Sequence, residues 1–203
     1  MDARLFGEVV VTLVVIMDPP GNVPIFLSVT RRLDDSERNR AAMLAVLTAL
    51  VIIVGFALLG ERILDYLNVS LPALQGAGGL LLLLVALELL TGEESAAFEA
   101  TPEQRMSIAM VPLGTPLLAG PGAIVATIVF VSQSDGASDW LAIGLGIVAV
   151  LLIIYVALRF AGILNRLLRP AGVLLLSRVA GILLAAIAVQ LIADATIQFA
   201  RQV

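Results

Sequence analysis

The first long apolar stretch of the chain, residues 7–30, is long enough to cross a bilayer but is interrupted at its centre by a polar, proline-containing motif. The motif is Asp18-Pro19-Pro20-Gly21-Asn22, with a further proline at position 24. Each proline lacks a backbone N–H and clashes with the carbonyl four residues earlier, so the carbonyls of Val15, Ile16 and Pro20 lose their helical partners. Free carbonyls and a carboxylate are costly in hydrocarbon unless they are buried in protein or line a cavity. The motif therefore predicts a broken helix that contributes to a binding site.

The composition is that of an integral membrane protein. Of 203 residues, 60% are hydrophobic and only 14% are charged, whereas about a quarter of the residues in a soluble domain are charged. The chain contains no Cys, His or Lys, and all 12 basic residues are Arg. These absences exclude disulfides, thiolate and imidazole metal sites, Ser-His triads and Schiff-base chemistry. We therefore expect a protein that is not an enzyme, with no cofactor, no metal and no nucleic-acid partner.

Six apolar segments follow one another, each close to the roughly 20 residues that cross a 30 Å hydrocarbon core. They are predicted at 7–30, 41–60, 71–91, 107–131, 139–160 and 178–199. The connections are short, and the last is predicted as a loop over residues 161–177. The expected fold is all-α, with six transmembrane helices in a single membrane domain over residues 1–203.

The arginines predict the orientation of this bundle. If the N-terminus faces out, nine of the 12 arginines fall on the inner side and three, Arg4, Arg62 and Arg201, on the outer side. Cytoplasmic loops carry an excess of Arg and Lys, so both termini are predicted to face outward.

An internal repeat relates the two halves of the chain. Residues 79–90 in the third segment align with residues 181–192 in the sixth, at an offset of 102, and Glu88 falls on Gln190. At an offset of 101, Pro20-Gly21 falls on Pro121-Gly122. Each half would have three spans, which is an odd number, so the two halves would enter the membrane from opposite sides. This predicts inverted repeats over about 1–101 and 102–203. Paired broken helices in corresponding positions are the sequence signature of a transporter's midplane site.

The fourth segment carries the second predicted break. It has three prolines and three glycines within eleven residues, 112–122. Gly120 and Gly122 permit unusual backbone angles, and proline suits the first turn of a helix, so Pro121 or Gly122 is expected to begin a half-helix. In the first segment, Asn22 is expected to cap a half-helix that begins at Val23.

These two motifs resemble the signatures of the MarC family. The runs are Asp-Pro-x-Gly-Asn-x-Pro-x-Phe, over residues 18–26, and Pro-Leu-Leu-Ala-Gly-Pro-Gly-Ala-Ile, over residues 116–124. Residues 178–190 are similar to a third family block, and the resemblance covers essentially the whole chain. Pro20 and Thr115 depart from the family pattern, which has aliphatic residues there. The resemblance implies a six-span protein of the prokaryotic inner membrane that is classed as a neutral amino acid transporter.

The expected function is secondary transport of small neutral amino acids by alternating access, with Na⁺ or H⁺ as candidate coupling ions. The predicted substrate-binding residues are Asp18, Pro19, Pro20, Gly21, Asn22, Thr115, Gly120, Pro121 and Gly122, with Glu88 and Gln190 as weaker candidates. The residues leave alternatives open: a structural role for Asp18, a headgroup contact for Glu88 and a helix–helix hydrogen bond for Gln190. A channel or a scaffold is the alternative function, and an intramembrane enzyme is less favoured. The oligomeric state is not readable from the sequence.

Overall fold

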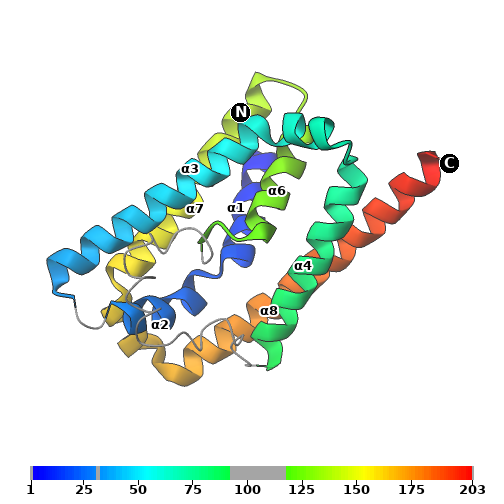
Figure 1. The fold of residues 1–203 in the computed structure, drawn as a ribbon. Coiled ribbons are helices and arrows are strands. Elements are labelled where there is room, and N and C mark those ends of the chain that lie inside the picture. Colours follow the sequence, from blue (N-terminus) through cyan, green and yellow to red (C-terminus); the bar gives the residue numbers. More distant parts are fainter. Residues whose placement is uncertain (1, 31–32, 92–117, 203) are drawn as a thin grey trace.

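The computed structural model describes residues 2–30, 33–91 and 118–202, and within these ranges the chain forms seven helices (Figure 1). They are α1 (Ala3–Met17), α2 (Pro19–Val29), α3 (Asp35–Leu67), α4 (Leu71–Thr91), α6 (Pro121–Ser132), α7 (Ala137–Arg159) and α8 (Ala161–Gln202). The prediction of an all-α membrane fold is confirmed.

Five helical stretches are long and apolar enough to cross a membrane: Ala3–Leu27, Asp35–Leu67, Leu71–Thr91, Ala137–Arg159 and Ala171–Arg201. The fourth predicted segment, 107–131, lies partly outside the described residues. Its described part forms the shorter apolar helix α6.

The predicted loop over residues 161–177 is wrong, because these residues belong to α8. The helix is interrupted only at Arg169, which has φ 56° and ψ 165°. The chain therefore changes direction at one residue and needs no long connection. Asn68, which ends α3, also has a positive φ of 53°, but its ψ of 37° places it in the left-handed region, which Arg169 does not occupy.

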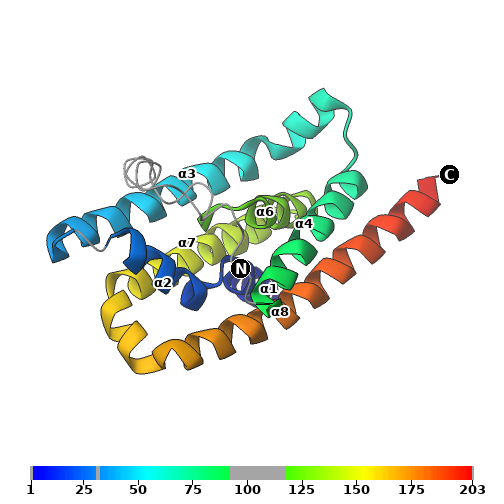
Figure 2. The ribbon, with the colours of Figure 1, turned by 60° about the horizontal axis from the view of Figure 1, so that its bottom comes forward.

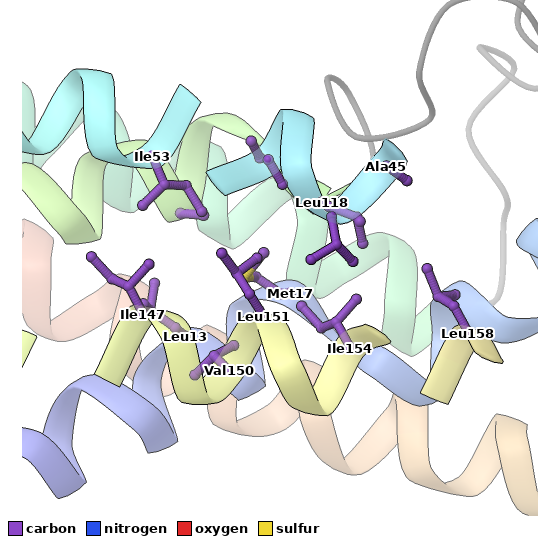
Figure 3. Close-up of a cluster of buried hydrophobic side chains, with 14 of the residues drawn as sticks. Leu13, Met17, Ala45, Ile53, Leu118, Ile147, Val150, Leu151, Ile154 and Leu158 are labelled. Atoms are coloured by element: carbon purple, nitrogen blue, oxygen red, sulfur yellow. The ribbon is translucent and has the colours of Figure 1, made fainter. Parts of the chain in front are cut away.

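The larger core lies between α1, α3, α6 and α7. Figure 3 shows part of it, with Met17 and Leu118 directed toward Leu151 and Ile154 of α7. Small residues let these helices approach closely, since a Cβ atom at Gly146 of α7 would lie 2.7 Å from Val9 of α1. Because lipid is as apolar as leucine, such close packing is what drives helix association in a membrane.

The helices α4 and α8 cross through two glycines. A Cβ at Gly79 would lie 2.8 Å from the carbonyl oxygen of Ala188, and a Cβ at Gly181 would lie 3.2 Å from that of Ala86. The two contacts are reciprocal, because Gly181 and Ala188 each follow their counterparts Gly79 and Ala86 by 102 positions. Each helix therefore contributes the same pair of groups to the crossing, a glycine and an alanine carbonyl.

The surface and the ends of the helices agree with a membrane-spanning bundle. Large apolar side chains point outward along the long helices, among them Val51, Leu58, Leu152 and Leu175. In Figure 2, α3 lies at one edge and α8 at the other, with α1, α6 and α7 between them. In Figure 1, both chain termini lie toward the upper end, and the start of α3, the end of α7 and the start of α8 lie toward the lower end.

Candidate functional site

The break in the first segment is a single residue. Asp18 has φ 36° and ψ 70°, in the left-handed region, and both ends α1 and precedes α2. Its N–H donates to the Val14 carbonyl at 3.0 Å, and its own carbonyl accepts from the Asn22 N–H at 3.1 Å. Asp tolerates the left-handed region better than most residues do. The prediction of a broken helix at this motif is confirmed, but the break is shorter than the motif.

The residues after Asp18 are helical, contrary to expectation. The helix α2 begins at Pro19, with proline in its first turn, where a missing N–H costs no hydrogen bond within α2. The prediction that Asn22 caps a helix beginning at Val23 is therefore wrong. Instead, the buried side-chain amide of Asn22 donates to the Met17 carbonyl, which lies at the end of α1 and would otherwise lack a partner.

The Asp18 carboxylate is buried beside α8. The residue is 8% exposed, and among the described residues its Oδ2 accepts no hydrogen bond. The polar groups that face the carboxylate are the backbone N–H of Gly21 and the hydroxyl of Ser177. A Cβ at Gly21 would overlap the carboxylate and lie 3.1 Å from the Ser177 Oγ. Glycine is therefore required at position 21 for the carboxylate to fold back toward α2.

Of the second predicted break, the structure describes the start of α6, since residues 92–117 lie outside the described residues. Gly120 precedes the helix in an extended conformation, and Pro121 is the first helical residue, as predicted. The Ile124 N–H donates to the Gly120 carbonyl at 3.2 Å, and no side chain caps the helix. The N–H groups of the first turn, at Gly122 and Ala123, therefore point beyond the helix end and give it a positive character.

The two breaks meet inside the bundle. A Cβ at Gly122 would lie 3.2 Å from Cγ2 of Ile16 in the last turn of α1, and would also contact Leu82 of α4. Met17, Leu118 and Ala119 belong to one buried cluster, and Figure 3 labels the first two near each other. The carbonyl end of α1, with Asp18 beside it, thus adjoins the N–H end of α6. A negative and a positive helix end lie next to each other at the buried centre.

Five of the predicted site residues, Asp18, Pro19, Pro20, Gly21 and Asn22, lie at the first break, and two more, Gly120 and Gly122, lie at the start of α6, where Gly122 adjoins Ile16 of α1. Pro121 adjoins them but is exposed. Glu88 is exposed on α4. Gln190 is exposed on α8, where its amide donates to Asp194 at 2.9 Å. Thr115 lies outside the described residues.

Sequence reasoning missed four buried polar side chains. Two of them, Thr30 and Thr127, donate to helix carbonyls four residues earlier. The other two are Ser177 and Gln75, which are 9% and 1% exposed. Ser177 was overlooked because it fell in the predicted loop. A usable signal was present, since extending the alignment of Gly79 with Gly181 by four residues pairs Gln75 with Ser177. In the part of the chain that the structure describes, no group of three or more acidic, His or Cys side chains could hold a metal ion.

An apolar helical bundle with five candidate spans and a carboxylate at a buried helix break defines a multi-pass integral membrane protein. The chain belongs to the MarC family of integral membrane proteins, whose model matches residues 3–199. It is 37% identical over 199 residues to a UPF0056 membrane protein of Methanocaldococcus jannaschii, covering 96% of this chain and 97% of the relative.

Bacterial and other archaeal relatives are similar along their length. A UPF0056 membrane protein of Archaeoglobus fulgidus is 37% identical over 187 residues, covering 90% of this chain and 88% of the relative. The UPF0056 membrane protein YhcE of Escherichia coli is 30% identical over 196 residues, covering 94% and 91%. These names describe membrane proteins and state no substrate. No solved structure matches the chain.

Proposed function

We propose that this protein is a secondary transporter for small neutral amino acids that works by alternating access. The observation that carries the proposal is the meeting of the two helix breaks, with the buried Asp18 carboxylate on one side and the uncapped start of α6 on the other. Unwound backbone and a carboxylate persist in a membrane protein where they serve a ligand pathway.

An inverted 3+3 repeat is part of this proposal. The reciprocal contacts of Gly79 and Gly181 support it. The helix starts agree as well, because α3 begins at Asp35 and α7 begins 102 residues later, at Ala137. In Figure 1, α3 and α7 run in opposite directions, as do α4 and α8. Inverted repeats of this kind provide the two opposite-facing conformations of many secondary transporters.

The charges at the breaks favour a zwitterion. An ammonium group matches the carbonyls of Val15 and Ile16 together with Asp18, and a carboxylate matches the first-turn N–H groups of α6. The position equivalent to Asp18 in the second half is Ala119, so the α6 end has no carboxylate to repel an anion. A coupling cation, Na⁺ or H⁺, would share the negative side with the ammonium.

The small residues at the breaks limit the side chain of the substrate. Gly21, Gly122 and Ala123 offer little space beyond the backbone, since Asp18 and Leu82 already lie against the two glycines. Arg178, which follows Ser177 on α8, is exposed, and no positively charged group of the described residues faces the Asp18 carboxylate, whose polar neighbours are Gly21 and Ser177. We therefore propose glycine, alanine and serine as substrates in preference to glutamate, lysine or sugars.

Uptake into proteoliposomes tests the proposal. Purified protein should take up labelled glycine and alanine with saturation, and unlabelled serine should compete. Glycinamide and N-acetylglycine each lack one of the two charges and should compete poorly. Equal competition by either analogue contradicts the zwitterion site, and uptake that never saturates would favour a channel.

A further inference from the structure

Gln75 of α4 is a buried polar side chain that the site leaves unexplained. It is 1% exposed, and its Oε1 accepts no hydrogen bond from the described residues. A buried amide oxygen without a donor is destabilising, and in a membrane no water from the hydrocarbon can satisfy it. An apolar residue of similar size would pack at this position without that cost. The position of Gln75 in the repeat suggests what its amide does.

Gln75 corresponds to Ser177. The reciprocal contacts of Gly79 with Ala188 and of Gly181 with Ala86 fix the offset between α4 and α8 at 102 residues. This offset places Gln75 on Ser177. The last helix of each half, α4 or α8, therefore carries one buried polar residue. In each helix this residue lies four positions before the glycine at the α4–α8 crossing.

The two halves nevertheless use these residues differently. Gly21 of α2, in the first half, lies against Ser177 of α8, in the second half. The matching Gly122 of α6, in the second half, lies against Leu82 of α4, in the first half. Leu82 is seven residues beyond Gln75. Seven residues are about two helical turns, or roughly 10.5 Å. The register of α2 on α8 therefore differs by seven residues from the register of α6 on α4.

We infer that Gln75 is the positioning residue of the second break in the opposite-facing state, an inference that rests on the proposed transport function. If the two halves exchange their registers, α6 moves from Leu82 to Gln75, and α2 moves from Ser177 to Leu184. The Gln75 Oε1 then accepts hydrogen bonds from the first-turn N–H groups of α6. This arrangement corresponds to the one in the present structure, in which Ser177 faces Asp18 and Gly21. The buried oxygen lacks a donor in this structure because its partner lies two turns away.

Disulfide trapping tests the register exchange, because the chain has no native Cys. The shared position is Val125, which packs so closely on Gly78 that a Cβ at position 78 would lie 2.9 Å from the Cβ of Val125. The Gly78→Cys/Val125→Cys pair reports the present register. The Pro72→Cys/Val125→Cys pair reports the other one, because a shift of seven residues brings position 125 next to position 71 or 72. Positions 72 and 78 are about 9 Å apart along α4, so one conformation cannot bring both within disulfide distance of position 125.

Both disulfides are expected to form in oxidised membranes. Glycine at about 10 mM, which is above the usual KM range of about 1 μM–1 mM, should change the ratio of the two disulfides. Failure of the 72–125 pair to form, with and without glycine, overturns the inference. If both form but no amino acid is taken up by proteoliposomes, the register exchange stands and the substrate assignment fails. If glycine is taken up but only the 78–125 pair forms, the inference alone fails.

Two substitutions separate a positioning role for Gln75 from mere packing. Gln75→Leu fills the space but cannot accept a hydrogen bond, and it should reduce the 72–125 yield at least about fivefold while leaving the 78–125 yield intact. Gln75→Ser, which introduces the residue found at the matching position 177 of the second half, should keep at least about half of the 72–125 yield, since about 0.4 kcal/mol corresponds to a twofold change. If Leu preserves the 72–125 yield and Ser abolishes it, Gln75 serves packing and the inference is wrong.

Discussion

Among single residues, the break between α1 and α2 depends on the backbone of Asp18. Its left-handed conformation lets α1 end and α2 begin within one residue, so the carboxylate and the free carbonyls of α1 lie at the same point. Asn shares the tolerance of Asp for this conformation. Charge and backbone geometry can therefore be changed separately at position 18.

The Asp18→Asn variant should fold normally and lose most of its transport. It keeps the shape of the side chain but turns a charge-assisted contact to the ligand, worth about 1.5–3 kcal/mol, into a neutral one, so glycine uptake should fall roughly tenfold or more. The matched control is Asp194→Asn on α8, whose carboxylate bonds only to the exposed Gln190 among the described residues and should transport as the wild type does. Normal folding with wild-type uptake in Asp18→Asn would assign Asp18 a structural role.

Gly21→Ala should destabilise the protein through a clash with Asp18. The added Cβ would overlap the carboxylate, and overpacking of this kind costs about 1–3 kcal/mol. Thermal unfolding in detergent measures the effect. Gly55→Ala is the control, since a Cβ there meets nothing within 4 Å. In an Asp18→Ala background the cost of Gly21→Ala should largely disappear, and an unchanged cost would show that the clash lies elsewhere.

At the scale of the helix, the crossing of α4 and α8 is the clearest contact between the two halves. Both glycines face a backbone carbonyl, which cannot rotate away as a side chain can. The crossing therefore depends on the absence of a Cβ at Gly79 and Gly181.

Gly79→Ala and Gly181→Ala should each lower the melting temperature, by an amount that corresponds to about 1–3 kcal/mol. The effect should be larger at Gly79, where the carbonyl would be 2.8 Å away, than at Gly181, where it would be 3.2 Å away. Gly162→Ala, with open space around it, is the control. Equal stability of all three variants would mean that α4 and α8 are less closely packed than the structure has them.

The helices show what the sequence could predict and what it could not. Local chemistry located the break in the first segment and the start of α6 at Pro121, because proline and glycine act on their own backbone. It could not tell that Asp18 alone leaves the helical conformation, or that Asn22 reaches back to Met17, since both depend on how α2 packs. Ser177 was missed because a single strained residue, Arg169, replaced the expected loop. Contacts between distant helices, such as Asp18 with Ser177, have no local signal.

At the scale of the whole molecule, the arginines indicate which end faces the cytoplasm. Arg38 and Arg40 begin α3, and Arg159 and Arg166 lie at the junction of α7 and α8. Figure 1 places these helix ends on the same side. The chain termini, with Arg4 and Arg201, lie on the other side. From the positive-inside rule, we predict that the first side faces the cytoplasm.

Labelling of single cysteines in intact cells tests this orientation. Ser36→Cys, in the first turn of α3, should be protected from a membrane-impermeant thiol reagent, and Ser138→Cys, in the first turn of α7, should react. Both positions are exposed, so a difference reports the side of the membrane. Permeabilised cells, in which both should react, provide the control. The reverse pattern of labelling would invert the proposed topology.

Counterflow of glycine distinguishes a carrier with two alternating faces from a channel or a scaffold. Proteoliposomes preloaded with unlabelled glycine should accumulate labelled glycine transiently above its external concentration, because a carrier that alternates between two faces exchanges one molecule for another. Asp18→Asn protein should accumulate little. Labelled glycine that only equilibrates, in preloaded and empty vesicles alike, would contradict alternating access at the paired helix breaks.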